Sequence, residues 1–312
     1  MAMGKRSSGE QLTFIEMLRQ EAGTKHAIVE TLLDSTWPYH EGAAAQLNQM
    51  WDLFSMYSDR EYIREFCASP HARYWEMYLA CAFADHPLLA PKPGPDLGIQ
   101  GIWRTIWIEA VTPSAGAKGN ANAVPYPIDG EASYVPTDLI TLRFTSAFKE
   151  KHQKYSEYRD KHIVASHDPC IVAISSQDLP WHPDFMSFLS SLFPIGPLSV
   201  NVKLDAARRI VSTTPHYPYR PGLSKASGSW IDTMVFMNSD ASQISGVIFC
   251  RPQFFRDISE LRKSLFYVHN PFAVNPIRVG GLGVGCEVTV EEEGGHWQFY
   301  AHDELGRSPL RV

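Results

Sequence analysis

The sequence predicts a mixed α/β protein made of three regions. Residues 1–68 contain apolar side chains at helical spacing, which is typical of packed amphipathic helices. Residues 69–180 include the short apolar run CIVAIS, which is typical of a buried strand. Residues 181–312 contain short strand-like runs separated by Pro and Gly, at 198–202, 246–250, 286–290 and 296–301. We therefore expect a helical N-terminal region, an α/β core, and a β-rich C-terminal region packed on that core.

Composition limits the classes of function. The chain has 312 residues, 44% of them hydrophobic and 20% charged, which excludes a mainly disordered protein. Its net charge of -6 argues against a basic nucleic-acid coat protein but leaves a local basic groove open. The five cysteines are widely spaced, so we expect reduced thiols. We see neither an apolar run of membrane-spanning length nor a secretory signal, and we expect a cytoplasmic protein with no membrane partner.

Two helices are expected before residue 90. The first has one apolar face, formed by Leu47, Met50, Trp51, Phe54 and Tyr57. The second follows Pro70 and ends before Pro87, because proline disfavours helix in the residue before it. Glu76 lies on the apolar flank of this second helix, which is an unusual place for a carboxylate.

Two short strands then place carboxylates close together. We expect strands at 97–99 and 106–111, with Asp96 at the start of the first. Alternation puts Glu109 on the same strand face as Trp107 and Val111. Burying a carboxylate among such apolar side chains costs free energy unless a cation or hydrogen bonds compensate it. A hairpin of this length brings Asp96 beside Glu109, so the two carboxylates could bind one divalent cation such as Mg²⁺.

Apolar residues in the segment 112–138 follow neither helical nor strand spacing, so we expect a long loop there. A strand is expected at 139–144, followed by a helix capped by Thr145 or Ser146. The run CIVAIS after this helix is expected to be a buried strand.

The helix that follows the long loop carries three lysines. Helical rotation places Lys151 near the middle of its apolar face, with Lys149 and Lys154 to either side. An inward lysine snorkels or is paired, and pairing with the carboxylates would let Lys151 hold a phosphate or orient a water. Tyr155 lies one turn further on. The alternative is a purely structural Lys–Glu pair.

In the order of these elements, the chain resembles the PD-(D/E)XK nuclease superfamily, which has the restriction-endonuclease-like fold. The resemblance covers about residues 70–176 and rests on Glu76, Pro95-Asp96, Glu109-Ala110-Val111, the TSAFKEKHQKY helix and the IVAIS strand. It implies that Asp96, Glu109 and the main-chain carbonyl of Ala110 bind Mg²⁺ or Mn²⁺, with Glu76 as an auxiliary acid. The superfamily lysine is replaced here by Val111, and Lys151 on the following helix is the residue that could serve in its place.

Three hypotheses follow for function. The first is a metal-dependent nuclease that hydrolyses phosphodiester bonds of nucleic acid, with DNA as the expected substrate and Asp96, Glu109, Lys151, Glu76 and Tyr155 in the catalytic set. The second is a nuclease-like module that has lost catalysis and binds a partner. The third is a serine hydrolase, because residues 146–149 match SxxK at an expected helix start.

Two segments are locally basic and are candidates for contact with phosphates. One is residues 143–161, with Lys149 and Lys154, and the other is residues 203–225, with Arg208 and Arg209. The sequence does not fix the oligomeric state, and a homodimer is compatible with it.

Overall fold

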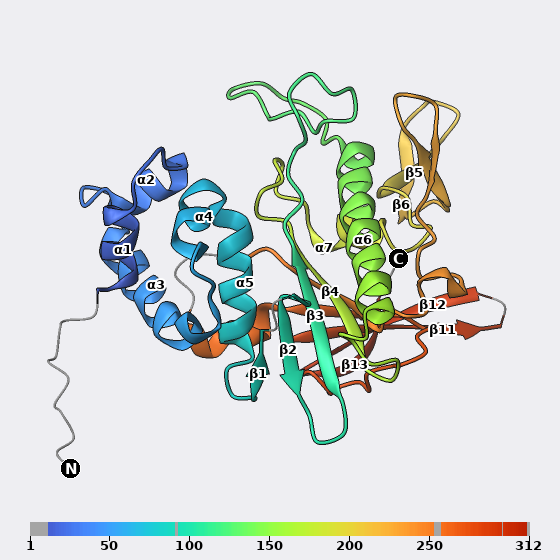
Figure 1. Cartoon of the computed structure of the whole chain (residues 1–312). Coiled ribbons are helices and arrows are strands. Elements are labelled where there is room, and N and C mark those ends of the chain that lie inside the picture. The colour runs from blue at the N-terminus through green and yellow to red at the C-terminus, as the bar shows by residue number, and fades with distance from the viewer. Residues whose placement is uncertain (1–11, 91–92, 253–256, 295, 311–312) are drawn as a thin grey trace, which may run out of the picture.

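A mixed β-sheet is the centre of the structure, a computed structural model that describes residues 12–90, 93–252, 257–294 and 296–310 (Figure 1). Within these residues nine strands form this one sheet. Their order across the sheet is β1 (Leu88–Leu89), β2 (Leu97–Gln100), β3 (Thr105–Val111), β4 (Cys170–Ser175), β9 (Gly246–Cys250), β10 (Phe266–His269), β11 (Cys286–Glu293), β12 (His296–Asp303) and β13 (Gly306–Leu310).

The pairing makes the sheet continuous across the expected boundary at residue 180. Strands β3, β4 and β9 are parallel neighbours, as are β10 and β11, and the other pairs are antiparallel. Because β9 pairs directly with β4, the C-terminal strands extend the sheet of the core rather than forming a separate layer on it.

Five helices lie on one side of the sheet, where α5 packs on the strands and α1–α4 pack on one another and on α5: α1 (Phe14–Gln20), α2 (Ala27–Leu33), α3 (His40–Phe54), α4 (Tyr62–Ala68) and α5 (Pro70–Ala82). A capping box between Thr13 and Glu16 starts α1. The apolar face predicted for α3 is buried from Leu47 to Phe54, and α5 begins at Pro70 as expected. The Trp75 indole N–H donates to Ala173 O over 3.0 Å and fixes α5 on β4.

Two helices, α6 (Thr137–Asp160) and α7 (Phe185–Leu189), pack on the opposite face. Alternate residues of β4 enter the two cores, with Ile171 and Ala173 facing α1–α5 and Val172 and Ile174 facing α6. This burial on both faces explains the unbroken apolar run CIVAIS, which is a strand as predicted.

The strand predicted at 139–144 is wrong, because these residues form the first turns of α6. Apolar residues at helical spacing, Ile140, Phe144 and Phe148, are buried against the sheet. Thr141 and Thr145 donate their hydroxyls to the carbonyls four residues earlier, at 2.8 and 2.9 Å, so these β-branched residues are accommodated in the helix.

The C-terminal strands were predicted correctly at three places, and β9, β11 and β12 occupy them. The run at 198–202 is different, because it enters β5 (Ser199–Leu204), which pairs only with β6 (Ile210–His216) in a separate hairpin. Strands β7 (Gly222–Ser224) and β8 (Trp230–Asp232) form a second small hairpin. Short 3-10 helices lie at Ser55–Tyr57, Ser239–Ala241, Ile258–Glu260 and Arg262–Ser264.

The long loop is present, and the cysteines are not paired with one another. Residues 112–136 contain neither helix nor strand, as predicted. All five cysteines are free thiols, and four of them are buried. Across the part of the chain that the structure describes, no helix has the length and apolar character needed to cross a membrane.

Candidate functional site

The β2–β3 hairpin brings Asp96 and Glu109 together. Leu97 is opposite Ile108 in the antiparallel register, so Asp96, one residue earlier, lies opposite Glu109. The Asp96 carboxylate accepts a hydrogen bond from the Ala110 backbone N–H, with Oδ2 2.8 Å from the nitrogen. This contact holds Asp96 at the start of β2 and directs it toward β3.

Glu109 is buried between β3 and α6, with 1% of its surface exposed. Its Oε1 atom accepts from Lys151 Nζ at 2.9 Å and from Lys154 Nζ at 3.1 Å. Its Oε2 atom is also buried and accepts no hydrogen bond of ordinary geometry from the described residues, although the Tyr158 hydroxyl lies close to the Glu109 carboxylate. A buried carboxylate oxygen without a donor is costly, so this atom marks a place where a cation or a water would be stabilised.

Charges at the site influence one another. Burial, and then the negative charge of Glu109, raise the pKa of Asp96, while Lys151 and the Ala110 amide oppose the shift. Burial alone would lower the pKa of Lys154, but the adjacent Glu109 carboxylate outweighs it and the pKa is raised. Burial and Glu109 together raise the pKa of Tyr158 to about 12. Lys154 therefore stays charged, and Asp96 holds its proton more tightly than an exposed aspartate does.

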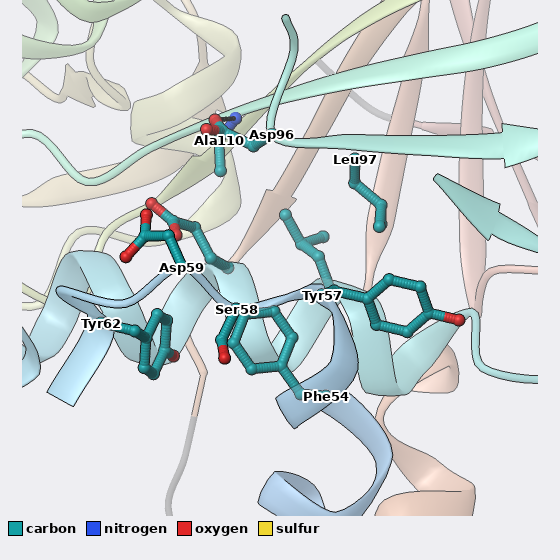
Figure 2. Close-up of a pocket in the computed structure, with 10 residues that line it drawn as sticks. Phe54, Tyr57, Ser58, Asp59, Tyr62, Asp96, Leu97 and Ala110 are labelled. Carbon is teal, nitrogen blue, oxygen red and sulfur yellow. Dashed lines mark hydrogen bonds between the residues drawn. The ribbon is translucent and has the colours of Figure 1, made fainter. Parts of the chain in front are cut away.

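Glu76 and Asp96 line the same small cavity on the α5 side of the sheet. Figure 2 shows the small cavity between α5 and the start of β2, which includes Asp59, Asp96 and Ala110 among its lining residues. Glu76 also lines this cavity, whose volume of about 20 Å³ is enough for one water. The Glu76 carboxylate accepts from Arg73 Nη1 at 2.7 and 2.9 Å, which explains how α5 holds a carboxylate on its apolar flank.

Tyr155 is not directed at the carboxylates. Its hydroxyl lies 3.0 Å from Trp107 O and 2.8 Å from Ile171 O, and the side chain is fully buried. Burial raises the pKa of Tyr155 well above its usual value. We predicted Tyr155 as a member of the catalytic set. In the structure its hydroxyl instead points to the backbone carbonyls of β3 and β4.

The predicted phosphate contacts do not share one surface. Lys154 is bound to Glu109, whereas Lys149 is exposed and lines a hollow with His152 and Asp232. The two lysines are five positions apart on the helix, which is a rotation of about 140°, so they face different directions. Arg208 and Arg209 lie in the turn of the β5–β6 hairpin, where Arg209 Nε donates to Asp205 at 2.8 Å. In Figure 1 this hairpin lies on the opposite side of α6 from β3.

The SxxK hypothesis is wrong in its structural premise. Ser146 lies in the interior of α6 rather than at its start, and both Ser146 and Lys149 are exposed. Nothing therefore buries or orients the pair as a nucleophile and its base.

Val111 is half-buried and packs with the core on the α6 face, while Lys151 comes from that helix to reach Glu109.

Sequence reasoning missed the role of Lys154 at Glu109 and the Arg73–Glu76 ion pair. Both had a sequence signal, because Lys151 and Lys154, like Arg73 and Glu76, are three residues apart on one helix and so lie on neighbouring parts of its surface.

The site contains a pair of carboxylates rather than a larger metal-binding cluster. No group of three or more His, Cys, Asp or Glu side chains that could hold a metal ion occurs in the described parts of the chain. Comparisons of the sequence with protein-family models and with curated proteins, and of the structure with solved structures, gave no match.

Proposed function

We propose that the chain is a metal-dependent nuclease with a restriction-endonuclease-like core, and that its substrate is DNA. The observation that carries the proposal is the buried Glu109 carboxylate, with Oε1 on two lysines and Oε2 without a donor beside Asp96. Two carboxylates can hold a metal ion and two ammonium groups can stabilise negative charge on a phosphate, so this group of side chains supports metal-assisted phosphodiester hydrolysis.

The donor set fits Mg²⁺ or Mn²⁺. Asp96 and Glu109 Oε2 would hold the ion, with the Ala110 carbonyl as a further oxygen ligand. Mg²⁺ keeps several waters and is commonly bound through one or two protein carboxylates together with substrate phosphates, so a pair of carboxylates is sufficient. When bound, the ion supplies a nucleophilic water and neutralises charge on the phosphate.

The lysines balance the charge of the site. With both carboxylates ionised, Lys151 and Lys154 leave the group of four side chains neutral, so a divalent cation gives it a net positive charge that attracts a phosphodiester. Lys151 is almost fully buried, and Lys154 is 41% exposed. Lys154 can therefore reach a substrate phosphate, while Lys151 orients Glu109 and stabilises negative charge that develops beside it.

Cleavage assays with matched variants test the proposal. Plasmid or oligonucleotide DNA incubated with Mg²⁺ or Mn²⁺ should be cut by the parent chain, and Asp96→Asn and Glu109→Gln should each reduce the rate at least about 100-fold. Glu150→Gln is the control, because it makes the same carboxylate-to-amide change at an exposed position of α6. Equal cleavage by all four proteins would contradict the site.

Calorimetry separates this function from the alternative of an inactive nuclease-like module. A nuclease should bind Mn²⁺ in the parent and lose that binding in Asp96→Asn. A chain that binds DNA or a protein partner but neither binds Mn²⁺ nor cuts DNA would be such a module.

A further inference from the structure

The β5–β6 hairpin has one apolar face that no part of the described chain covers. Figure 1 shows the hairpin extending away from the nine-stranded sheet, beside the N-terminal half of α6. Each side chain on this face has between 49% and 66% of its surface exposed. The residues are Leu198, Val200, Val202, Leu204, Ile210 and Val211.

The register of the hairpin puts Val200, Val202, Leu204 and Ile210 on the same side, together with Thr213 and Pro215. Val202 is opposite Thr213 and Leu204 is opposite Ile210, and directly opposed residues of an antiparallel pair point to one face. The register shifts between Lys203 and Leu204, so Val211 is an extra residue that lies beside Ile210. The apolar face therefore runs along the whole hairpin without a charged residue.

The other face is polar throughout. It carries Ser199, Asn201, Lys203, Ser212, Thr214 and His216. Thr213 is a polar exception on the apolar face, and the division is otherwise typical of a sheet with one buried and one solvated face. A two-stranded hairpin is at best marginally stable alone, so an uncovered apolar face indicates an interface.

The chemistry of the apolar face argues for a second copy of the chain. Nucleic acid gains little from a face without charges, since the basic groups of the hairpin are Lys203 on the polar face and Arg208 and Arg209 in the turn. An identical apolar ribbon is complementary to it, because two sheets pack face to face with interdigitating aliphatic side chains and polar residues outward.

The available area is sufficient for a specific dimer. Six half-exposed aliphatic residues from each of two copies present on the order of 1,000 Å² in total, which is about the smallest area of a specific protein interface. We propose that the chain forms a two-fold symmetric homodimer in which the apolar faces of two β5–β6 hairpins pack together as a small sandwich.

The oligomeric state of the full chain in solution tests this proposal. Analytical ultracentrifugation without nucleic acid should show a dimer that dissociates at about micromolar concentration, as expected for a minimal interface. Val202→Asp, near the middle of the apolar face, should raise the dissociation constant at least about tenfold. Asn201→Asp adds the same charge one residue earlier on the polar face and should leave the constant within about twofold.

Crosslinking gives a second measurement that does not depend on a destabilising charge. A short bismaleimide should link two copies of Val202→Cys but not two copies of Thr214→Cys, in which the thiol is on the polar face, nor the parent. A chain that stays monomeric at about 100 µM, that dimerises equally well with Val202→Asp, or that uses this face only on lipid vesicles or on DNA would overturn the proposal.

Discussion

Lys151 Nζ lies 2.9 Å from Glu109 Oε1, and both side chains are buried between α6 and β3. Breaking such a pair on one side leaves a charge in an apolar environment, which costs several kcal/mol, whereas replacing both partners by uncharged groups costs far less. The interaction therefore predicts different stabilities for single and double variants.

Glu109→Gln should lower the free energy of unfolding by about 3 kcal/mol, which is at the low end of the cost of breaking a buried ion pair. The cost is at the low end because the Asp96 carboxylate still lies near Lys151 and compensates part of its charge. The double variant Glu109→Gln/Lys151→Met should recover most of that loss, since Met fills a similar volume without a charge. Urea denaturation of the parent, both single variants and the double variant measures the coupling. Strictly additive effects would mean that the two side chains do not interact.

Asp96→Asn should remove the proposed nuclease activity and at the same time stabilise the fold at neutral pH. Burial and Glu109 raise the pKa of Asp96, so the folded chain binds this proton more tightly than the unfolded chain. Stability is therefore lost as the pH rises from the usual aspartate value through the raised pKa. Asn has no charge to desolvate, and its amide oxygen can still accept from the Ala110 N–H.

Thermal denaturation in EDTA between about pH 3 and pH 8 checks the sign of this effect. The variant should melt above the parent at pH 7, and the difference should shrink toward pH 3, where Asp96 is protonated in both the folded and the unfolded chain. A variant that melts below the parent at pH 7 would show that ionised Asp96 stabilises the fold.

The sequence was sufficient to place Asp96, Glu109 and Lys151 because strand alternation and helical rotation depend only on residue spacing. Asp96 lies opposite Glu109 by hairpin register, and Lys151 points to the sheet by rotation about α6. The same reasoning did not predict that Lys154 also reaches Glu109. Spacing alone places Lys154 beside Lys151 on α6, but whether Lys154 reaches Glu109 depends on how α6 sits on β3, which tertiary packing determines.

The error at 139–144 has a related cause. Short apolar runs with β-branched residues fit a strand and a buried helix equally well by periodicity. The helix forms because Ile140 and Phe144 continue the buried stripe of Phe148, while the hydroxyls of Thr141 and Thr145 bond within the helix. The separate β5–β6 hairpin was missed because alternation identifies a strand but not the sheet to which it belongs.

Tyr155→Phe should lower stability by about 1–3 kcal/mol and leave cleavage almost unchanged. The single hydroxyl proton is shared between the backbone carbonyls of Trp107 and Ile171, and removing the hydroxyl takes that donor away from two buried acceptors. Denaturant unfolding and the cleavage rate at saturating metal should be measured on the same preparation. A large loss of rate with normal stability would instead make the hydroxyl part of the chemistry.

The salt dependence of DNA binding should separate Arg208 from Arg209. Each phosphate contact adds about 0.9 to the slope of log K against log salt concentration on duplex DNA. Arg209 is engaged by Asp205, whereas the side chain of the neighbouring Arg208, at the same exposed turn, has no hydrogen bond or ion pair with the described residues. Arg208→Gln should therefore reduce the slope by about 1, and Arg209→Gln by less. Catalytically impaired Asp96→Asn is the background for these titrations, which keeps the DNA intact. Identical slopes for both variants and their parent would place the DNA away from this hairpin.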